Sequence, residues 1–455
     1  MRTSFTPEQL RDPEIGEANG ILETCVHYGF CTNTCPTYVL TRDENESPRG
    51  RIDLIREMLE QGGAPKPETV RHLDSCLSCL SCMSTCAAKV DYAHLIDRAR
   101  VHVERHHRRP FFDRLMRASL ATVLTRPRLF RAALALGQAA KPFRGLMPAR
   151  LAPLFDMLPS RAAGQFLDPA VFAGTRPARK RVALLAGCAQ QALNGNINAA
   201  TIRLLQRLGC DVVVATDAGC CGSLSLHMGK EDAARALARQ NIEAWLREKE
   251  FYGLDAVVIN ASGCGTTVKD YGHLLARDTE LSSAAATIAS LARDVSEVLA
   301  ELGFAVADKK PAYRVAYHDP CSMQHGQKVA RQPRALLREA GFEVLDIPER
   351  HFCCGSAGTY NLLQPGTAAQ LGARKAGHIA STDPDIVVTG NIGCIIQIQR
   401  HSRIPVVHTV ELLDWATGGP TPPSLVGTTL REPIAKAANQ PSSTGATDPG
   451  SPGFW

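Results

Sequence analysis

Long apolar runs and aromatic residues are scarce in this sequence. Phe, Trp and Tyr together make up 5% of the 455 residues. No apolar run approaches the roughly 18 residues of a membrane-spanning helix, and the residues after Met1 show no apolar core of a secretory signal. We therefore expect a cytoplasmic chain, in which the reducing environment disfavours disulfides.

Motifs for nucleotides and nucleic acids are missing as well. No Gly-x-Gly-x-x-Gly follows a predicted strand, and no P-loop is present. No motif that reads nucleic acid accompanies the basic residues. The chain is therefore not expected to bind flavin, nucleotide or nucleic acid itself.

Acidic residues are rare between residues 101 and 150, although the net charge of the whole chain is only +6. Ten arginines and one lysine stand there against Glu104 and Asp113, a local charge of +9 with apolar residues interleaved. This pattern favours helices with a solvated basic face. The alternative is a peripheral contact with the inner face of the cell membrane.

Cysteine, in contrast, is abundant, with sixteen residues, and seven of them form two runs near the N-terminus. The first run contains Cys25, Cys31 and Cys35, and the second contains Cys76, Cys79, Cys82 and Cys86. The second follows C-x2-C-x2-C-x3-C, the spacing at which one loop wraps thiolates around a [4Fe–4S] cluster. Structural zinc is less favoured, because zinc takes four ligands and usually pairs them two and two. The runs predict an electron carrier with two clusters.

The first run departs from the pattern at Tyr28, where a second cysteine is expected. A phenol of pKa about 10 is a poor substitute for a thiolate. Three outcomes are open for this site: a three-iron cluster, a four-iron cluster with an oxygen or external thiol on the fourth iron, or no cluster. A second departure is Ala87, where proline is usual; proline supplies no ligand, so this change is milder.

The last cysteine of each run is expected to cross to the other cluster, as in two-cluster ferredoxins. This crossing predicts one ligand set made of Cys35, Cys76, Cys79 and Cys82. The other set is Cys25, Cys31 and Cys86, with Tyr28 facing the fourth iron.

The chain divides into five segments. Residues 1–105 predict a helical ferredoxin domain, with helices beginning near Ser47 and Asp91. Residues 106–178 hold the basic helical segment and a linker from about 150 onward, and the Pro-, Ser-, Thr- and Gly-rich tail 418–455 is expected to be disordered. An internal repeat lies between, in segments 179–305 and 311–417. We predict an α plus α/β fold: a helical two-cluster ferredoxin domain followed by two repeated α/β Cys-Cys-Gly domains.

Each repeat alternates predicted strands with helices, which favours a parallel sheet. The predicted strands cover 181–186, 212–215 and 256–260 in the first copy and 313–317, 343–347 and 385–390 in the second. In both copies a lone cysteine precedes a Cys-Cys-Gly by 32 residues, and another cysteine follows. The cysteines are Cys188, Cys220, Cys221 and Cys264 in the first copy and Cys321, Cys353, Cys354 and Cys394 in the second.

These repeat cysteines fall at strand ends, where open α/β sheets bind ligands, so each copy can bring four thiols to one metal or redox site. Buried, inert thiols are the alternative. The glycine after each pair is expected to let the backbone approach a bound group. Four histidines are near in sequence, although a histidine near a strand end is more often structural than a ligand. They are His318, His325, His351 and His408.

With these motifs, the chain resembles the iron–sulfur subunit of bacterial glycolate oxidase, also called glycolate dehydrogenase, over roughly residues 5–417. The resemblance rests on segments 25–38, 47–52, 187–190, 218–222, 261–265 and 353–360. Tyr28 and Ala87 depart from that family's pattern. The repeats are also similar to those of heterodisulfide reductases, in which a fifth cysteine completes each site. Here Thr267 and Gln397 stand at that position.

The resemblance implies an electron-transfer subunit without catalytic residues of its own. FAD-binding partner subunits would oxidise glycolate to glyoxylate, and this chain would pass the electrons to a quinone or another acceptor. The alternatives are a D-lactate or other 2-hydroxyacid dehydrogenase subunit, a thiol–disulfide redox enzyme with clusters at the Cys-Cys-Gly sites, and a zinc-stapled interaction protein.

Overall fold

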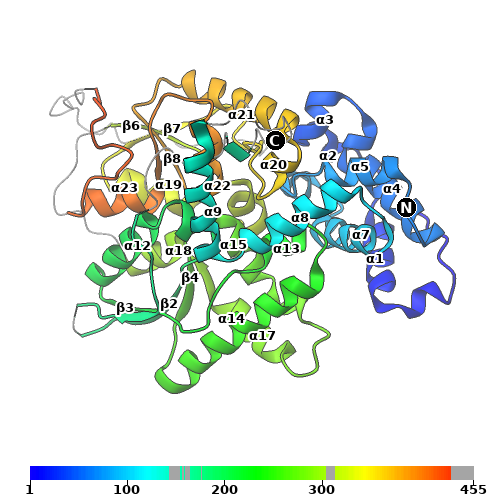
Figure 1. The fold of residues 1–455 in the computed structure, drawn as a ribbon, viewed down its shortest axis with the longest axis horizontal. Helices are drawn as coiled ribbons and strands as arrows, with labels where there is room; N and C mark the ends of the chain where they lie inside the picture. Colours follow the sequence, from blue (N-terminus) through cyan, green and yellow to red (C-terminus); the bar gives the residue numbers. More distant parts are fainter. Residues whose placement is uncertain (143–153, 156–157, 159–163, 176, 304–312, 432–455) are drawn as a thin grey trace, which may run out of the picture.

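The computed structural model describes residues 1–142, 154–155, 158, 164–175, 177–303 and 313–431. A helical N-terminal domain, blue to cyan in Figure 1, lies at one end of the molecule. Two α/β repeats, green and yellow to red, occupy the rest. This order confirms the predicted fold class.

Short helices joined by tight turns build the N-terminal domain. They are η1 (Gln9–Arg11), α1 (Pro13–Thr24), α2 (Phe30–Asn33), α3 (Pro36–Thr41), η2 (Glu44–Glu46), α4 (Pro48–Gln61), α5 (Pro67–Asp74), α6 (Ser81–Thr85) and α7 (Tyr92–His106). The Ser47 side chain caps α4 by accepting from Gly50 N, and Asp91 caps α7 in the same manner, as the turn chemistry predicts. Apolar faces of α1, α4 and α7 pack around Leu22, Ile55 and Leu95.

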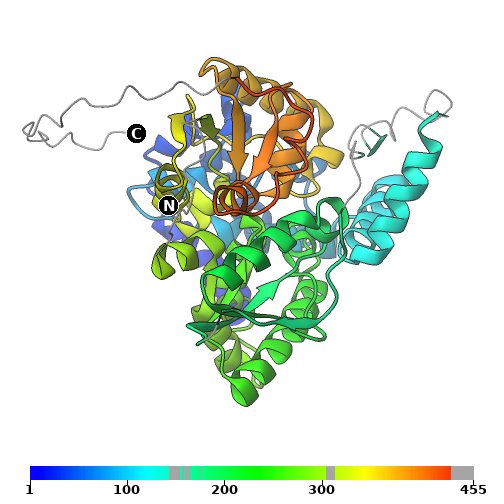
Figure 2. The same cartoon turned by 90° about the vertical axis from the view of Figure 1, so that its left-hand side faces the viewer.

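The basic segment forms two helices, α8 (Phe111–Val123) and α9 (Pro127–Ala140), which Figure 2 shows as a cyan pair at the edge of the molecule. Among the described residues, no helix is both long and apolar enough to cross a membrane. The stretch expected to be a linker lies partly outside the described residues. Its described part contributes a strand, β1 (Ala170–Phe172), which pairs antiparallel with β3 (Cys210–Val214) at the edge of the first sheet.

The first repeat surrounds a sheet of order β1-β3-β2-β4-β5, parallel except for β1. Its strands are β2 (Lys180–Leu185), β3 (Cys210–Val214), β4 (Ala256–Ile259) and β5 (Ala292–Asp294). Its helices are α11 (Ala189–Leu193), α12 (Asn196–Arg207), α13 (Ser223–His227), α14 (Glu231–Tyr252), α15 (Ser262–Lys269), α16 (Tyr271–Leu274), α17 (Ser282–Leu291) and α18 (Val295–Leu302).

The second repeat has a fully parallel sheet of order β7-β6-β8-β9. Its elements are β6 (Arg314–Tyr317), η5 (Ser322–Gln327), α19 (Arg331–Glu339), β7 (Glu343–Asp346), α20 (Tyr360–Leu363), α21 (Pro365–Ala380), β8 (Ile386–Thr389), α22 (Ile392–Gln399), β9 (Val406–His408) and α23 (Thr409–Ala416). The order matches β3-β2-β4-β5, so the internal repeat is also a repeat of topology. Each copy also has a fourth strand, β5 or β9, in addition to the three predicted from the sequence. Each of these strands is only three residues long.

The two repeats share a core and a set of polar contacts. Apolar residues of both sheets, from Val182 to Val407, form one buried cluster. Asp414 of α23 accepts hydrogen bonds from Arg203 and Arg207 of α12. Ser262 N donates to the Gly390 carbonyl at 3.3 Å. The ends of β4 and β8 are therefore held against each other.

The tail begins as packed structure, which corrects the expectation of disorder for residues 418–431. Leu425 is 4% exposed in the shared core, and Arg431 forms an ion pair with Asp383. Residues 432–455 lie outside the described residues.

Candidate iron–sulfur and thiol sites

The structure brings the seven N-terminal cysteines around two neighbouring cavities. One cavity is lined by Cys35, Cys76, Cys79 and Cys82, and we call it the inner cavity. The other is lined by Cys25, Cys31, Cys86, Tyr28 and also Cys82, and we call it the outer cavity. Each expected ligand set lines one cavity, although Cys82 lines both, and the assignment of ligands to clusters stays a prediction. A set of four thiols around one cavity has the donor chemistry of a [4Fe–4S] site.

The inner cavity has a buried hydrogen-bonding shell. Arg51, 1% exposed, donates to Cys35 Sγ at 3.8 Å and to the Glu46 carboxylate at 2.6 Å. The Tyr92 hydroxyl donates to Cys76 Sγ at 3.7 Å. Burial opposes the charge of Arg51, but Cys76, Tyr92 and Cys35 together keep its pKa above its usual value. Donors directed at sulfur stabilise added negative charge on a thiolate-bound cluster.

The loop that carries the second cysteine run is held in its conformation by Arg100 of α7. Ser78 and Leu80, between the cysteines, have φ values of 49° and 61°, in the left-handed region that non-glycine residues rarely adopt. Arg100 donates to the Ser78 hydroxyl and to the Cys76 carbonyl, each at 2.6 Å. These contacts fix the loop so that its thiols line the inner cavity.

The outer cavity lies closer to solvent. Val26, Tyr28 and Phe30 are 55%, 65% and 44% exposed. The Tyr28 ring stacks on Phe30, with 6.1 Å between the ring centroids. Burial, followed by the neighbouring Cys25 and Cys86, raises the pKa of Cys31 to about 11. Four thiols, of which Cys82 also lines the inner cavity, and one exposed phenol therefore surround the outer cavity.

In the first repeat, four thiols meet at the ends of β2, β3 and β4. Cys188 precedes α11, Cys220 and Cys221 follow β3, and Cys264 lies in the first turn of α15. The Cys188 and Cys221 thiols hydrogen-bond to Cys220 and hold its pKa well below the usual range. The Asn241 side chain, on α14, hydrogen-bonds to the backbone of the cysteine loop: it accepts from Gly219 N and donates to the Cys220 carbonyl.

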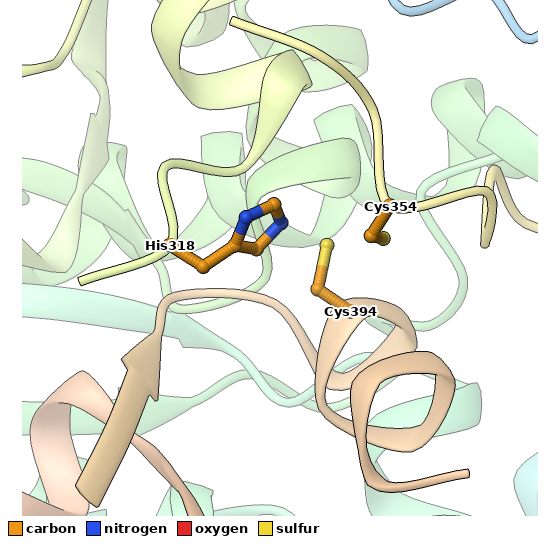
Figure 3. Close-up of side chains that lie close together, drawn as sticks. All are labelled: His318, Cys354 and Cys394. Carbon is orange, nitrogen blue, oxygen red and sulfur yellow. The ribbon is translucent and has the colours of Figure 1, made fainter. Parts of the chain in front are cut away.

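In the second repeat, four thiols and a histidine converge. Cys321 and Cys353 lie with their sulfurs 3.8 Å apart. Figure 3 shows the His318 ring beside the Cys354 and Cys394 thiols, and one ligand atom of each lies within 4.8 Å of the other two. Burial and the nearby Lys375 hold the pKa of His318 well below its usual value, so the ring is neutral. A neutral imidazole is the form that binds metals.

The glycine after each cysteine pair has a different role from the one expected. Gly222 and Gly355 both have a φ of 89°. A Cβ on Gly222 would lie 2.9 Å from the Ala234 carbonyl oxygen of α14, and one on Gly355 would lie 2.7 Å from that of Ala368 in α21. The glycine therefore admits a neighbouring helix and a left-handed turn, rather than a bound group.

The second-repeat thiols lie next to the inner cavity. Cys353 shares a buried apolar cluster with Leu77 and Cys79 of the N-terminal domain and with Tyr360 and Leu371 of its own repeat. Cys321 packs at the edge of this cluster. Two sulfur sites, distant in sequence, thus meet across one domain boundary.

The other histidines have structural partners. His325 pairs with the Ser84 hydroxyl at 2.8 Å and with the His351 carbonyl at 3.2 Å. His351 packs against Phe352. His408 caps α23 by accepting from Val410 N. Arg51, Tyr92 and Lys375 also belong to these sites, although no sequence motif marks them. His318, expected to be structural, lies at a site as well, and the repeats distinguish it because Leu185 stands at the equivalent position, three residues before Cys188.

Fold and site define a class: an iron–sulfur protein with a two-site helical ferredoxin domain joined to two cysteine-rich α/β domains. Two family models match accordingly. The 4Fe-4S dicluster domain covers residues 21–90, and the cysteine-rich domain named CCG covers residues 182–269 and 315–399.

Relatives extend the match to most of the chain. It is 39% identical to the glycolate oxidase iron-sulfur subunit of Escherichia coli, over 91% of this chain and 99% of that protein. The probable glycolate oxidase iron-sulfur subunit of Bacillus subtilis is 32% identical over 88% and 95%. Lactate utilization protein A of Oceanobacillus iheyensis is 26% identical over 51% of this chain and 96% of its own. The chain belongs to the family of glycolate oxidase iron–sulfur subunits.

A solved structure supports the fold alone. The crystal structure of a hypothetical protein from Helicobacter pylori aligns with a TM-score of 0.53 and 10% identity, over 90% of this chain and 73% of that one.

Proposed function

We propose that this chain is the iron–sulfur electron-transfer subunit of a glycolate dehydrogenase complex. The observation that carries the proposal is the relation to the E. coli glycolate oxidase subunit over nearly its full length, combined with thiols gathered around two adjacent cavities. FAD-binding partner subunits oxidise glycolate to glyoxylate. This chain accepts the electrons and delivers them to a quinone or another acceptor.

The proposed ligands of the inner cluster are Cys35, Cys76, Cys79 and Cys82. The proposed ligands of the outer cluster are Cys25, Cys31 and Cys86. A bound cluster supplies one-electron redox chemistry, and the protein fixes its potential through hydrogen bonds and burial. Arg51 and Tyr92 direct donors to inner-cavity sulfurs, which favours the reduced state there. The eight repeat cysteines form the proposed sites for further metal or cluster binding.

The exposed rim of the outer cavity is the proposed contact for a flavin-bearing partner. Val26, Tyr28 and Phe30 are apolar side chains with more than two fifths of their surface exposed. Apolar and aromatic side chains of this kind are enriched at the centres of protein interfaces. A partner covering them would also bring its cofactor towards the outer site.

A peripheral membrane contact is proposed for α8 and α9. Phe111, Phe112 and Leu115 of α8 and Leu136 of α9 are 62%, 68%, 52% and 72% exposed, beside exposed arginines such as Arg114. Apolar side chains flanked by cations suit an anionic lipid surface, where a quinone pool is found. The chain then works at the cytoplasmic face of the membrane.

Tyr28 makes the outer site a proposed three-iron centre, or a four-iron centre that readily loses one iron. The phenol is 65% exposed and lies on Phe30, so a thiolate is missing at this side of the cavity. Tyr28→Cys is expected to stabilise a four-iron cluster and to raise the iron content by about one per chain. Iron analysis and the paramagnetic spectra of the oxidised proteins check this. Identical iron and spectra in both proteins would show that Tyr28 has no part in ligation.

Co-expression tests the function. The tagged full chain is expressed with candidate FAD-binding glycolate oxidase subunits, purified without oxygen, and assayed with glycolate and D-lactate. The expected result is a complex that contains FAD and oxidises glycolate faster, whereas the chain alone forms no glyoxylate. Faster turnover of D-lactate would favour the alternative 2-hydroxyacid. Glyoxylate formation by the isolated chain would refute the subunit role.

A further inference from the structure

The two repeats have the same cysteines but different surroundings, and the difference is concentrated at two positions. His318 precedes Cys321 by three residues, and Leu185 precedes Cys188 by the same interval. Lys375 on α21 corresponds to Asn241 on α14, because each lies seven residues after the alanine that packs on the Cys-Cys-Gly glycine. The second repeat thus adds an imidazole and an ammonium group to its four thiols.

His318 is buried without a conventional role. It is 1% exposed, and neither ring nitrogen has a hydrogen-bond partner among the described residues. Leaving a buried polar group unpaired is unfavourable, and most such groups in folded proteins are satisfied. One nitrogen of the ring faces the Cys354 and Cys394 thiols within 4.8 Å (Figure 3). The unpaired nitrogen and the thiols together have the arrangement of a ligand set.

We propose that His318 is a direct ligand of an iron–sulfur centre in the second repeat, together with Cys321, Cys353, Cys354 and Cys394. This proposal rests on the iron–sulfur function proposed above and assigns the centre's nitrogen ligand. The first repeat has no counterpart, since Leu185 is an apolar side chain with 2% exposure. The two repeats are therefore chemically unequal sites.

Five donors favour a cluster over a single zinc ion. Zinc in structural sites takes four ligands, whereas four thiols and an imidazole can serve several irons. The ammonium group of Lys375 lies close to Cys353 and Cys354. Lys375 is 2% exposed and donates to the Glu349 carbonyl at 2.8 Å. A nearby cation offsets the negative charge of thiolates and sulfide. Replacing thiolate by imidazole raises cluster potentials, as in Rieske centres.

The test uses the full chain purified without oxygen, with histidine labelled by ¹⁵N. Wild type, His318→Leu, His318→Cys and His351→Leu are compared. His318→Leu gives the second repeat the residue of the first, and His351→Leu is the matched control near Cys353. Iron, sulfide and zinc are measured, and pulsed paramagnetic resonance of the reduced proteins detects nitrogen bound to iron.

A ¹⁵N-histidine coupling is expected in wild type and His351→Leu and is lost in both His318 variants. His318→Cys keeps the iron of wild type, because a thiolate replaces the imidazole, and lowers the potential of that centre. The proposal is overturned if the coupling is absent from wild type, if it persists in His318→Leu, or if His318→Leu loses zinc and not iron. Glycolate oxidation with the partner subunits is recorded in parallel. Its absence throughout would refute the proposed function while leaving the nitrogen coupling as evidence.

Discussion

The two repeats contact the N-terminal domain in different ways. The first repeat is held by charged groups: His94 pairs with Asp270, His227 with Asp97 and Lys230 with Glu104, at 3.0, 3.3 and 2.6 Å. The second repeat is held by apolar packing around Cys79 and Cys353, bordered by a hydrogen bond between Ser84 and His325. Within the part of the chain that the structure describes, it is the contact of the second repeat that brings cysteines of two sites together, Cys79 and Cys353.

This difference separates anchoring from redox coupling. Ion pairs between partly exposed side chains weaken in salt and depend on pH, but they tolerate small displacements. Close apolar packing is insensitive to both and permits little displacement. Electron transfer between centres needs a fixed short separation, so apolar packing at Cys79 suits the sulfur contact. The charged contact orients the rest of the domain.

The largest effect is expected at the apolar contact. Cys79→Ser removes a proposed ligand of the inner cluster, and a serine hydroxyl is a poor ligand for iron that prefers thiolate. We expect the iron content to fall by about four per chain, with loss of one reduced-state paramagnetic signal and of electron flow to the acceptor. The control is Cys210→Ala, because Cys210 lies in β3 away from the cavities. Unchanged iron and signal in Cys79→Ser would remove the inner-cluster assignment.

Residues close in sequence carried most of what could be predicted. The cysteine spacing of the second run and the 32-residue interval of the repeats gave the domain order, because local loops and βα units are specified locally. The contact of Cys79 with Cys353 could not be predicted, since it depends on how whole domains pack. The same applies to Arg51, which reaches Cys35 from a helix whose pattern is that of an ordinary amphipathic helix.

Two further differences have local physical causes. The fourth strands β5 and β9 are three residues long, too short to show a periodic pattern, and they pair only because β4 and β8 offer free edges. The beginning of the tail is rich in Pro, Gly and Thr, a composition that favours disorder. Leu425 nevertheless finds a place in the shared core, so one apolar side chain overrides the composition.

A smaller effect is expected at the charged contact, through His94. Its two ring nitrogens face Asp91 at 2.6 Å and Asp270 at 3.0 Å. Burial lowers the pKa of His94, but hydrogen bonds to Asp270 and Asp91 outweigh it and raise the pKa from 6.5 to about 10. A raised histidine pKa adds stability that is complete below the unfolded value of 6.5 and is lost as the pH rises through about 10.

His94→Gln, which keeps a hydrogen-bond donor but removes the charge, is therefore expected to lower the free energy of unfolding. The loss should be on the order of 3 kcal/mol near neutral pH and should shrink towards zero above about pH 10. Denaturant titrations of both proteins across this range check the difference. A constant difference at every pH would mean that the histidine acts by packing alone.

The smallest effect is expected from replacing Lys230. This replacement tests whether one ion pair or several hold the first repeat against the N-terminal domain. The Lys230 ammonium lies 2.6 Å from the Glu104 carboxylate, but both side chains are about one quarter exposed, at 27% and 26%. Exposed ion pairs contribute about 0.2–1 kcal/mol, so Lys230→Met should cost roughly 0.5 kcal/mol in low salt and nothing measurable in about 1 M salt. Lys249→Met, an exposed position on α14, is the matched control and should cost less. A loss above about 2 kcal/mol that survives salt would show that the first repeat relies on one anchoring pair, and not on several weak pairs that involve Glu104, Asp97 and Asp270.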